Sequence, residues 1–376
     1  MDLPQLPLTG IYVDRPCPGR YPDFDQALMF CADCGHAQLL NAIDPDYLYV
    51  QTYSHRSSSS DVAMQGNDFF YSFLERIAQG RNFKAVVEVG CNDLDLLKKL
   101  QSKGERLFGI DPIWRHAERP RDSKITVIGK FIEEVDLEKE IEVRPDLVIS
   151  AHTFEHMDDP RSRLEDLIRF ADKRALFVIA VPAFDSLLRV SRFDQVFHQH
   201  VQYFSVVSLR RLIEELGGRY LTHAFNYQCW NGTLLMAFCK DHGTSHEERS
   251  VGGFERTNPE KIRRRVQEFK ERMAYVSEFV HKLEKPVYGY GAAQMVPVLA
   301  YHLKSDLGFL ECILDDDPRR EGLCYPALAV KIRRPWPEIS WDSASVMITA
   351  LDSARPIAQR LLAVKPRYFF APIEVW

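Results

Sequence analysis

The sequence predicts an α/β protein whose main domain is a doubly wound, Rossmann-like sheet. A small irregular N-terminal module and a second, smaller Rossmann-like domain are expected to flank it. Three observations predict this class. Apolar runs of strand type alternate with segments of helical spacing up to about residue 240, a charged stretch then interrupts the alternation, and a strand, a glycine turn and a helix follow it. Such alternation is typical of parallel sheets covered by helices. The 376 residues also exceed one ordinary core.

Four segments are expected along the chain. Residues 1–60 are rich in Pro, Tyr and Asp with little periodicity, which predicts an irregular module. Residues 61–240 carry the doubly wound sheet. Residues 241–285 are highly charged, and their second half has helical spacing from Val266 to Val280, which predicts a loop and a long linker helix. Residues 286–376 form the smaller domain.

The elements of the main domain are predicted in chain order. A helix is expected from about residue 61, because five apolar side chains recur there at helical spacing: Phe69, Phe70, Phe73, Leu74 and Ile77. Gly80 is its expected end. "KAVVEVG" predicts a buried strand, "DLDLLKKLQSKG" a helix that ends at Gly104, and "RLFGIDP" a second strand. "PDLVISAHTFEH" and "RALFVIAVPAF" contain the third and fourth strands.

Composition excludes several classes of function. The formal net charge is -5 and the basic residues form no block, which disfavours nucleic-acid binding. No apolar run approaches the roughly 20 residues that span a bilayer, and the first residues lack the pattern of a secretory signal. Of the eight cysteines, only Cys31 and Cys34 form a motif-like pair. A disulfide framework is therefore not expected, and the prediction is a cytoplasmic protein with no membrane or nucleic-acid partner.

A ligand site is predicted at the carboxyl edge of the main sheet. Glu88 lies near the end of the first strand, Gly90 opens a polar turn, and Asp111 ends the second strand about 20 residues later. An acid at that place suits a ribose diol, but the turn lacks the glycines of a pyrophosphate site. A nucleoside without a pyrophosphate, such as S-adenosylmethionine, fits better. The alternative is an ordinary α/β turn, since one such glycine and acid are common.

The third strand adds small and polar residues, Ser150 to His152, at the same edge. The residues "FEHMDDP" after it have a plain alternative as the acidic start of a helix. The expected cofactor-contacting residues are Glu88, Gly90, Cys91, Asn92, Asp111, Pro112, Phe131, Ala151 and His152.

The stretch "FHQHVQYF" carries His198 and His200, and three interpretations are open. Two histidines two apart on a strand share one face and could chelate a metal if Asp194 supplied a third ligand. They could pack between aromatic residues as ordinary core side chains. A histidine with a near-neutral pKa could also act as a general base.

Five segments together resemble the nucleotide-sugar C-methyltransferase family: "EVGCNDLDLL", "GIDP", "AHTFEHMDDP", "FDQVFHQHVQYFS" and "GYGAAQMVPVLAYH" with its later "LDDDP". The resemblance covers nearly the whole chain. It implies an N-terminal zinc module, a central S-adenosylmethionine domain, a C-terminal Rossmann-like domain, and a sugar nucleotide between the domains. It also implies that His200 is the base that removes a proton beside a ketone, with His198 as a second catalytic residue. Gln199, Tyr203 and Tyr290 are the expected contacts of the sugar nucleotide.

The sequence departs from the family pattern in three places. Only one C-x-x-C pair is present, Cys31 and Cys34, although a structural zinc needs four ligands, so bound zinc stays open. Leu94 replaces the last glycine of "GCNDG" and would be tolerated with a helical backbone. The family's "YHEH" reads "FHQH", so Phe197 lacks a hydroxyl and Gln199 lacks a charge.

These last changes leave other functions open. The protein could methylate oxygen or nitrogen of a related sugar nucleotide, or bind a sugar nucleotide without catalysis. A nicotinamide oxidoreductase is disfavoured by the sparse glycine turn.

Overall fold

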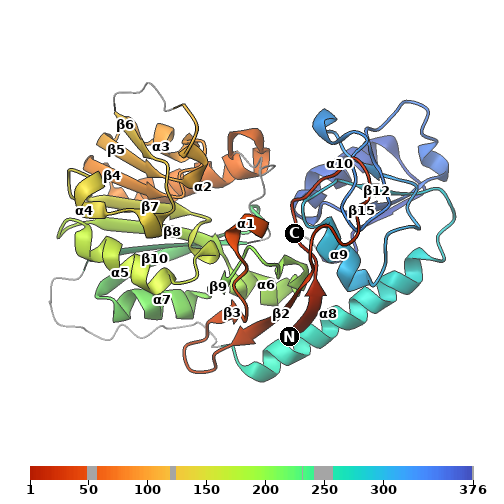
Figure 1. Ribbon diagram of the computed structural model, residues 1–376, viewed down its shortest axis with the longest axis horizontal. Coiled ribbons are helices and arrows are strands. Elements are labelled where there is room, and N and C mark those ends of the chain that lie inside the picture. Colours follow the sequence, from red (N-terminus) through yellow and green to blue (C-terminus); the bar gives the residue numbers. More distant parts are fainter. Residues whose placement is uncertain (49–56, 119–123, 231, 241–256, 375–376) are drawn as a thin grey trace.

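The computed structural model describes residues 1–48, 57–118, 124–230, 232–240 and 257–374. Three sheets are arranged side by side (Figure 1). A seven-stranded sheet forms one end of the molecule, a five-stranded sheet forms the other, and a four-stranded sheet lies between them above the long helix α8. The expected α/β class with flanking modules is therefore confirmed.

The seven-stranded sheet has the order β10-β11-β8-β7-β4-β5-β6. Its strands are β4 (Phe83–Val89), β5 (Gly104–Ile110), β6 (Ile125–Ile128), β7 (Leu147–Ala151), β8 (Leu176–Pro182), β10 (Gly218–Asn226) and β11 (Thr233–Lys240). β4 to β8 are mutually parallel, and β11 runs antiparallel to both of its neighbours. The chain moves outward from β4 to β6 and then returns to β7. This reversal leaves a crevice at the carboxyl ends of β4 and β7, where ligands bind in doubly wound sheets.

Helices cover both faces of this sheet (Figure 1). They are α2 (Asp61–Ala78), α3 (Asp95–Lys99), α4 (Leu137–Glu140), α5 (Pro160–Phe170) and α7 (Val206–Glu215). A further helix, α6 (Phe184–Val190), buries Phe184, Leu187 and Leu188 in a separate apolar cluster that includes residues of the N-terminal sheet. Two apolar clusters lie on opposite faces of the strands: Val87 and Val89 belong to one, and Val86 with Phe70 of α2 belongs to the other. The alternate strand residues face opposite sides, so each face buries its own helices.

The helix expected to end at Gly104 is shorter than predicted. α3 ends at Lys99, and the backbone carbonyl of the fully buried Leu100 accepts the N–H groups of Lys103 and Gly104. This tight turn leads directly into β5, of which Gly104 is the first residue. A Cβ at Gly104 would lie 3.1 Å from the Val86 side chain, so the glycine permits close packing of the strand rather than ending a helix.

The N-terminal residues form a regular sheet rather than an irregular module. β1 (Asp2–Leu6), β2 (Phe24–Phe30) and β3 (Ala37–Leu39) pair antiparallel, followed by the short α1 (Pro45–Leu48). The fourth strand, β9 (Gln202–Tyr203), comes from the "FHQHVQYF" stretch and pairs with β3. Because the partner strand lies more than 160 residues away in sequence, local periodicity carries no signal for this sheet.

The five-stranded sheet is entirely parallel, in the order β14-β13-β12-β15-β16. Its elements are β12 (Val287–Tyr290), α9 (Val296–Leu303), β13 (Ile313–Leu314), β14 (Ile332–Arg333), β15 (Ser345–Ile348), α10 (Ala354–Val364) and β16 (Tyr368–Phe370). The expected linker helix is α8 (Pro259–Val280), which buries Phe269, Met273, Val276 and Val280. The charged loop before it lies largely outside the described residues.

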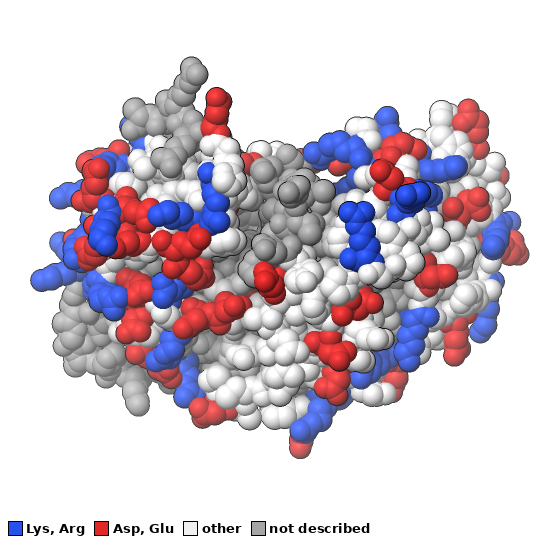
Figure 2. Space-filling model, viewed as in Figure 1, with Lys and Arg blue, Asp and Glu red and all other residues white. Residues whose placement is uncertain are grey.

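The surface carries both charges. On the face shown in Figure 2, Lys and Arg side chains lie among Asp and Glu side chains and do not gather in one basic patch. Among the described residues, no helix combines the length and apolar character needed to cross a bilayer.

Candidate active site

A cavity of about 1000 Å³ opens at the carboxyl edge of β4, β5 and β7. It lies where the sheet reverses its strand order, as expected from the topology. All nine residues predicted to contact the cofactor line it: Glu88, Gly90, Cys91, Asn92, Asp111, Pro112, Phe131, Ala151 and His152. The structure thus brings together in one cavity residues that span more than 60 positions of the sequence.

The turn after β4 needs glycine at position 90. Gly90 has a φ of 77°, and a Cβ there would lie 1.8 Å from Thr153 Oγ1. The backbone N–H groups of Gly90 and Cys91 donate to the Ile110 carbonyl at 2.8 and 3.2 Å. These bonds fix the turn against β5, and the missing side chain lets it approach the segment after β7 closely.

Two acidic residues, Asp111 and Glu88, line the cavity, and they differ in their hydrogen-bond partners. Asp111 accepts the N–H groups of Asn92 at 2.8 Å and Ile113 at 3.0 Å, so backbone donors orient its carboxylate. Glu88 is buried, and its Oε2 has no partner among the described residues. Burial, and then the nearby Asp111, raise the pKa of Glu88 well above its usual value. Its carboxyl group is therefore available as a hydrogen-bond donor.

Leu94, the residue in place of the family's glycine, does not have a right-handed helical backbone. Its φ of 70° and ψ of 16° are left-handed, a conformation that costs an L-residue roughly 1 kcal/mol. The Leu94 side chain is fully buried in the cluster that contains Phe70 and Leu97. Apolar burial there offsets the backbone strain, so the side chain is accommodated although the condition of a helical backbone is not met.

A second pocket, of about 170 Å³, adjoins the first and shares His152, His156 and Trp230 with it. Residues of "FHQHVQYF" line it: Phe197, Gln199, His200 and Tyr203. The C-terminal part of the chain also reaches it through Gln294, Met295 and Asp352. The pocket therefore lies where the two Rossmann-like parts meet, beside the larger cavity.

His200 has an environment suited to an uncharged imidazole. Its ring packs 4.2 Å from Phe197 and 5.0 Å from His156, measured between centroids. Burial, and to a lesser extent the neighbouring His156, lower the pKa of His200 to about 3, while Glu155 opposes this shift. At neutral pH the ring is therefore unprotonated, the state from which a general base accepts a proton, but this pKa differs from the near-neutral value expected from the sequence and makes His200 a weaker base.

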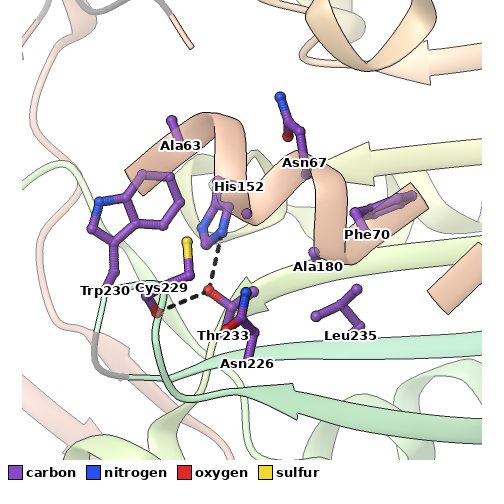
Figure 3. A pocket seen from close by; sticks show the side chains of 12 residues that line it. Ala63, Asn67, Phe70, His152, Ala180, Asn226, Cys229, Trp230, Thr233 and Leu235 are labelled. Carbon is purple, nitrogen blue, oxygen red and sulfur yellow. Dashed lines mark hydrogen bonds between the residues drawn. The ribbon is translucent and has the colours of Figure 1, made fainter. Parts of the chain in front are cut away.

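His152, in the wall shared by the two pockets, is the centre of a hydrogen-bonded chain to Glu155 and Thr233, and Figure 3 shows the Thr233 side of this chain. His152 contacts Glu155 Oε1 through Nδ1 at 3.2 Å and Thr233 Oγ1 through Nε2 at 3.3 Å. Its ring stands edge-on to Trp230 at 4.3 Å. Burial raises the pKa of Glu155, but the bond to His152 and the nearby His156 outweigh it, so the pKa lies below its usual value. Glu155 is therefore a buried carboxylate beside the histidines.

The two histidines of "FHQHVQYF" face different partners. The residues before β9 form a turn, closed by the His200 N–H on the Phe197 carbonyl at 3.1 Å, rather than a continuous strand. His198 lies outside both pockets: its Nε2 bonds the Leu6 carbonyl at 2.9 Å and its ring packs edge-on against Phe24. His198 therefore supports the N-terminal sheet, while His200 lines the second pocket.

The three predicted sugar contacts are also separated. The Gln199 side chain donates to the Leu48 carbonyl at 2.9 Å and accepts from Thr9, so its amide is occupied. The Tyr203 hydroxyl accepts the Phe197 N–H at 3.2 Å at the wall of the second pocket. Tyr290 lines neither pocket, and its hydroxyl contacts the Asp316 carboxylate at 3.3 Å.

A four-ligand zinc site is not assembled among the described residues. Cys31 is exposed and Cys34 is half-buried, and neither belongs to a group of three possible ligands. His36 lies near Cys34 in sequence and could in principle replace a missing zinc ligand, but its Nε2 is bonded to the Gln202 side chain at 2.8 Å. Asp194 pairs with Arg192, so it does not join the two histidines as a metal ligand. Within the described part, three possible ligand atoms converge only at Glu155, His156 and His200, within 4.8 Å of one another.

Glu155, His156, Arg192 and Trp230 are among the residues of the second pocket that sequence reasoning missed. For Glu155 and His156 a signal existed, because they follow the carboxyl end of β7 directly. For Arg192 and Trp230 there was none, since each lies in an irregular segment far from β7 in sequence.

Comparisons with known proteins agree with this architecture. Residues 64–223 match the family model described as "Methyltransferase domain". The chain is 28% identical over 249 residues to the C-methyltransferase NovU of Streptomyces niveus, a match that covers 65% of this chain and 58% of that protein. The chain therefore spans somewhat more than half the length of this relative.

Solved structures show weaker likeness. The N-methyltransferase NodS of Bradyrhizobium japonicum, in complex with S-adenosyl-L-homocysteine, has a TM-score of 0.38 at 15% identity and covers 48% of this chain and 88% of its own. Magnesium protoporphyrin IX methyltransferase from Synechocystis, with bound S-adenosylmethionine, has a TM-score of 0.36 at 11% identity and covers 48% and 80%. Residues 64–223, which match the methyltransferase family model, contain the five parallel strands of the seven-stranded sheet and most of the residues that line the larger cavity at their carboxyl edge.

Proposed function

We propose that the protein transfers a methyl group from S-adenosylmethionine to a carbon beside the ketone of a nucleotide-linked sugar. One observation carries the proposal: the cavity with the expected cofactor residues and the pocket with His200 share a wall, formed by His152, His156 and Trp230. A methyl donor on one side and a base on the other would thus be adjacent. NovU, the curated relative, is a C-methyltransferase.

The residues around the larger cavity fit the proposed cofactor. Asp111 is a carboxylate at the end of the second strand, where a ribose diol is bound in such folds. The turn from Gly90 to Asp93 would hold the methionine part, since Gly90 lets the backbone approach a ligand. The unpartnered Oε2 of Glu88 is a buried polar atom that a bound ligand would satisfy.

His200 is the proposed general base. When bound, S-adenosylmethionine supplies an electrophilic methyl group on a sulfonium. His200 accepts the proton from the carbon beside the ketone at a ring nitrogen, which is unprotonated because its pKa is low. The electron pair of the broken C–H bond would then form the new carbon–methyl bond as the sulfur–methyl bond of the sulfonium breaks, which would leave S-adenosylhomocysteine, and the proton passes from His200 to solvent. Glu155, which raises the pKa of His200, stabilises the imidazolium formed in this step.

A second candidate is methylation of oxygen or nitrogen in a related sugar nucleotide. Phe197 has no hydroxyl, and the Gln199 amide is bound by Leu48 and Thr9, so neither can assist an enolate as the family's tyrosine and glutamate could. A third candidate is a protein that binds a sugar nucleotide without catalysis.

Hydrogen exchange separates these candidates. The protein is incubated in D₂O with a thymidine-diphosphate-linked 4-keto-6-deoxyhexose, and deuterium uptake beside the ketone is followed by NMR. C-methylation with His200 as base predicts uptake that His200→Gln abolishes, while binding of S-adenosylhomocysteine measured by calorimetry is unchanged. Methyl transfer without uptake in the wild-type protein would favour the oxygen or nitrogen acceptor. No binding of S-adenosylhomocysteine would overturn every methyltransferase reading.

A further inference from the structure

The second pocket is surrounded by buried polar atoms that have no partner. Among the described residues, three that line it bury such an atom: Oε2 of Glu155, Oγ of Ser186 and Nη1 of Arg192. A buried polar group without a hydrogen bond costs roughly 1–3 kcal/mol, so such groups are rare in folded proteins. Their grouping around one pocket indicates that a polar ligand completes their hydrogen bonds.

Arg192 is the unusual member of this group. Its side chain is only 1% exposed, yet it lies beside a ligand pocket. Its Nε and Nη2 donate to the two carboxylate oxygens of Asp194 at 2.7 and 2.8 Å, and Nη2 also donates to Asp352 at 3.1 Å. This bidentate geometry fixes the guanidinium plane and leaves Nη1 as the nitrogen without an acceptor.

The local charge limits what Nη1 can bind. Arg192, Asp194 and Asp352 together carry a formal charge of -1, because two carboxylates face one guanidinium. Gln195 also joins this network: it donates its side-chain amide to Asp352 and adds no charge. A phosphate or a developing enolate would meet net repulsion here, whereas an uncharged oxygen gains a charge-assisted hydrogen bond.

We infer that Arg192 is a specificity-determining residue, whose Nη1 donates a hydrogen bond to a hydroxyl group of the methyl acceptor. The hydroxyl is one that stays neutral during the reaction, not the ketone oxygen. This inference rests on the proposed function, because it places the acceptor in the second pocket. Asp352 is a positioning residue: it comes from the C-terminal part of the chain, lies in the short helix Leu351–Ser353, and holds both Arg192 and Gln195.

The test compares acceptors that differ by one hydroxyl. The parent keto-sugar nucleotide and its monodeoxy analogues are assayed for methyl transfer, and kcat/KM is measured for each. A lost hydrogen bond to a charged donor costs about 2–3 kcal/mol, so the wild-type protein is expected to reject one analogue by about 30- to 150-fold. Arg192→Lys is expected to reduce that preference to about threefold and to leave preferences at the other positions unchanged.

Substitution of Arg192 leaves two carboxylates in a buried place, which can destabilise the fold. A second variant, Arg192→Met with Asp194→Asn, removes one of these charges together with the guanidinium. Arg106→Met is the matched control, since Arg106 pairs with Glu142 at 2.7 Å on the surface. Each variant is checked for unchanged binding of S-adenosylhomocysteine.

The outcomes are distinct. If Arg192 only supports the pocket wall, both variants lose kcat/KM equally on every acceptor and keep the wild-type preference, which overturns the inference. Selective loss at one hydroxyl supports it. If the wild-type protein methylates no keto-sugar nucleotide at all, the proposed function itself fails, and that result is seen before any variant is compared.

Discussion

Two histidines in one short stretch show how strongly the fold differentiates single residues. His198 and His200 are two positions apart, yet His198 bonds the carbonyl of Leu6 and His200 lines the second pocket. The sequence predicts a catalytic role for both, with His200 as the base. It cannot predict which side each ring faces, because that depends on a turn before β9 and on the distant strand β1.

The low pKa of His200 makes a prediction for the pH dependence of catalysis. The base is active when neutral, so activity falls only as the pH drops through its folded pKa of about 3. We therefore expect the rate of deuterium exchange beside the ketone to show no acid limb between pH 8 and 5. An ordinary histidine would lose activity near its unperturbed pKa of about 6.5. A limb near that value would contradict the assignment of His200.

Glu155→Gln tests the neighbour of this base. Glu155 raises the pKa of His200, so removal of its charge makes His200 a weaker base. The exchange rate at pH 7 is expected to fall about 3- to 10-fold without an acid limb appearing at higher pH. Glu142→Gln, on the exposed surface, is the control and should leave the rate unchanged. An unaltered rate in the Glu155 variant would remove Glu155 from the mechanism.

Asp111 provides a separate test of the cofactor cavity. Its carboxylate is oriented by Asn92 and Ile113, and Asp111→Asn keeps its size but removes the charge and one acceptor. We expect the Kd of S-adenosylhomocysteine, measured by calorimetry, to rise about 10-fold, equivalent to about 1.4 kcal/mol. Asp68→Asn, at an exposed ion pair with Lys99, is the control. Equal affinity for both variants would show that Asp111 does not hold the ribose.

At the scale of elements, the turn between β4 and α3 combines predictable and unpredictable features. Gly90 was predictable because a glycine after a strand suits a positive φ, and it has one. Leu94 was not, because local sequence did not reveal that its backbone is left-handed while its side chain fills the core beside Leu97. Burial outweighs backbone preference at this position.

In this turn, the glycine and alanine variants of Leu94 are expected to rank in the opposite order of stability from the order found inside a helix. In a helix, glycine is less stable than alanine by about 1 kcal/mol. At Leu94, with a φ of 70°, both substitutions lose the buried side chain, but only glycine also relieves the left-handed strain. Leu94→Gly is therefore expected to be more stable than Leu94→Ala by about 1 kcal/mol in urea unfolding. The same pair at Leu97, inside α3, is the control and should show the usual order.

The elements that sequence predicted and missed differ in the range of their contacts. The parallel strands β4, β5, β7 and β8 are continuous apolar runs, because both of their faces are buried, and they were all predicted. β3 and β9 have three and two residues, too few for any periodicity to appear. They exist because they pair with each other across the sequence, which a local pattern cannot reveal.

For the whole molecule, one core joins parts that the sequence divides. A single apolar cluster contains Leu3 of the N-terminal sheet, Phe184 of α6, Phe269 of α8 and Val298 of α9. Polar contacts cross the same junction, including Arg192 to Asp352 and the Tyr12 hydroxyl to the Ala292 carbonyl at 2.8 Å. A continuous apolar core favours cooperative unfolding. The second pocket therefore adjoins the same apolar cluster that stabilises the fold.

His302, which lies at this junction, is expected to make the free energy of unfolding depend on pH. It lies on α9, its ring packs edge-on against Phe269 of α8 at 4.8 Å, and its Nε2 is buried without a partner among the described residues. Burial lowers the pKa of His302 to about 4, the backbone of Phe193 opposes this shift, and Lys270 adds to it. The folded state therefore holds this ring neutral, whereas the unfolded chain protonates it below pH 6.5.

The sign of the resulting effect follows from proton uptake. Below pH 6.5 the unfolded state binds more protons than the folded state, so stability is full above that pH and is lost as the pH falls toward 4. Between pH 7 and pH 5, His302 should cost about 2 kcal/mol of the free energy of unfolding. His302→Gln keeps a hydrogen-bonding side chain that does not titrate, and urea unfolding at both pH values should show a pH-dependent loss smaller by that amount. An equal loss in wild type and the His302 variant would show that this junction does not respond to pH.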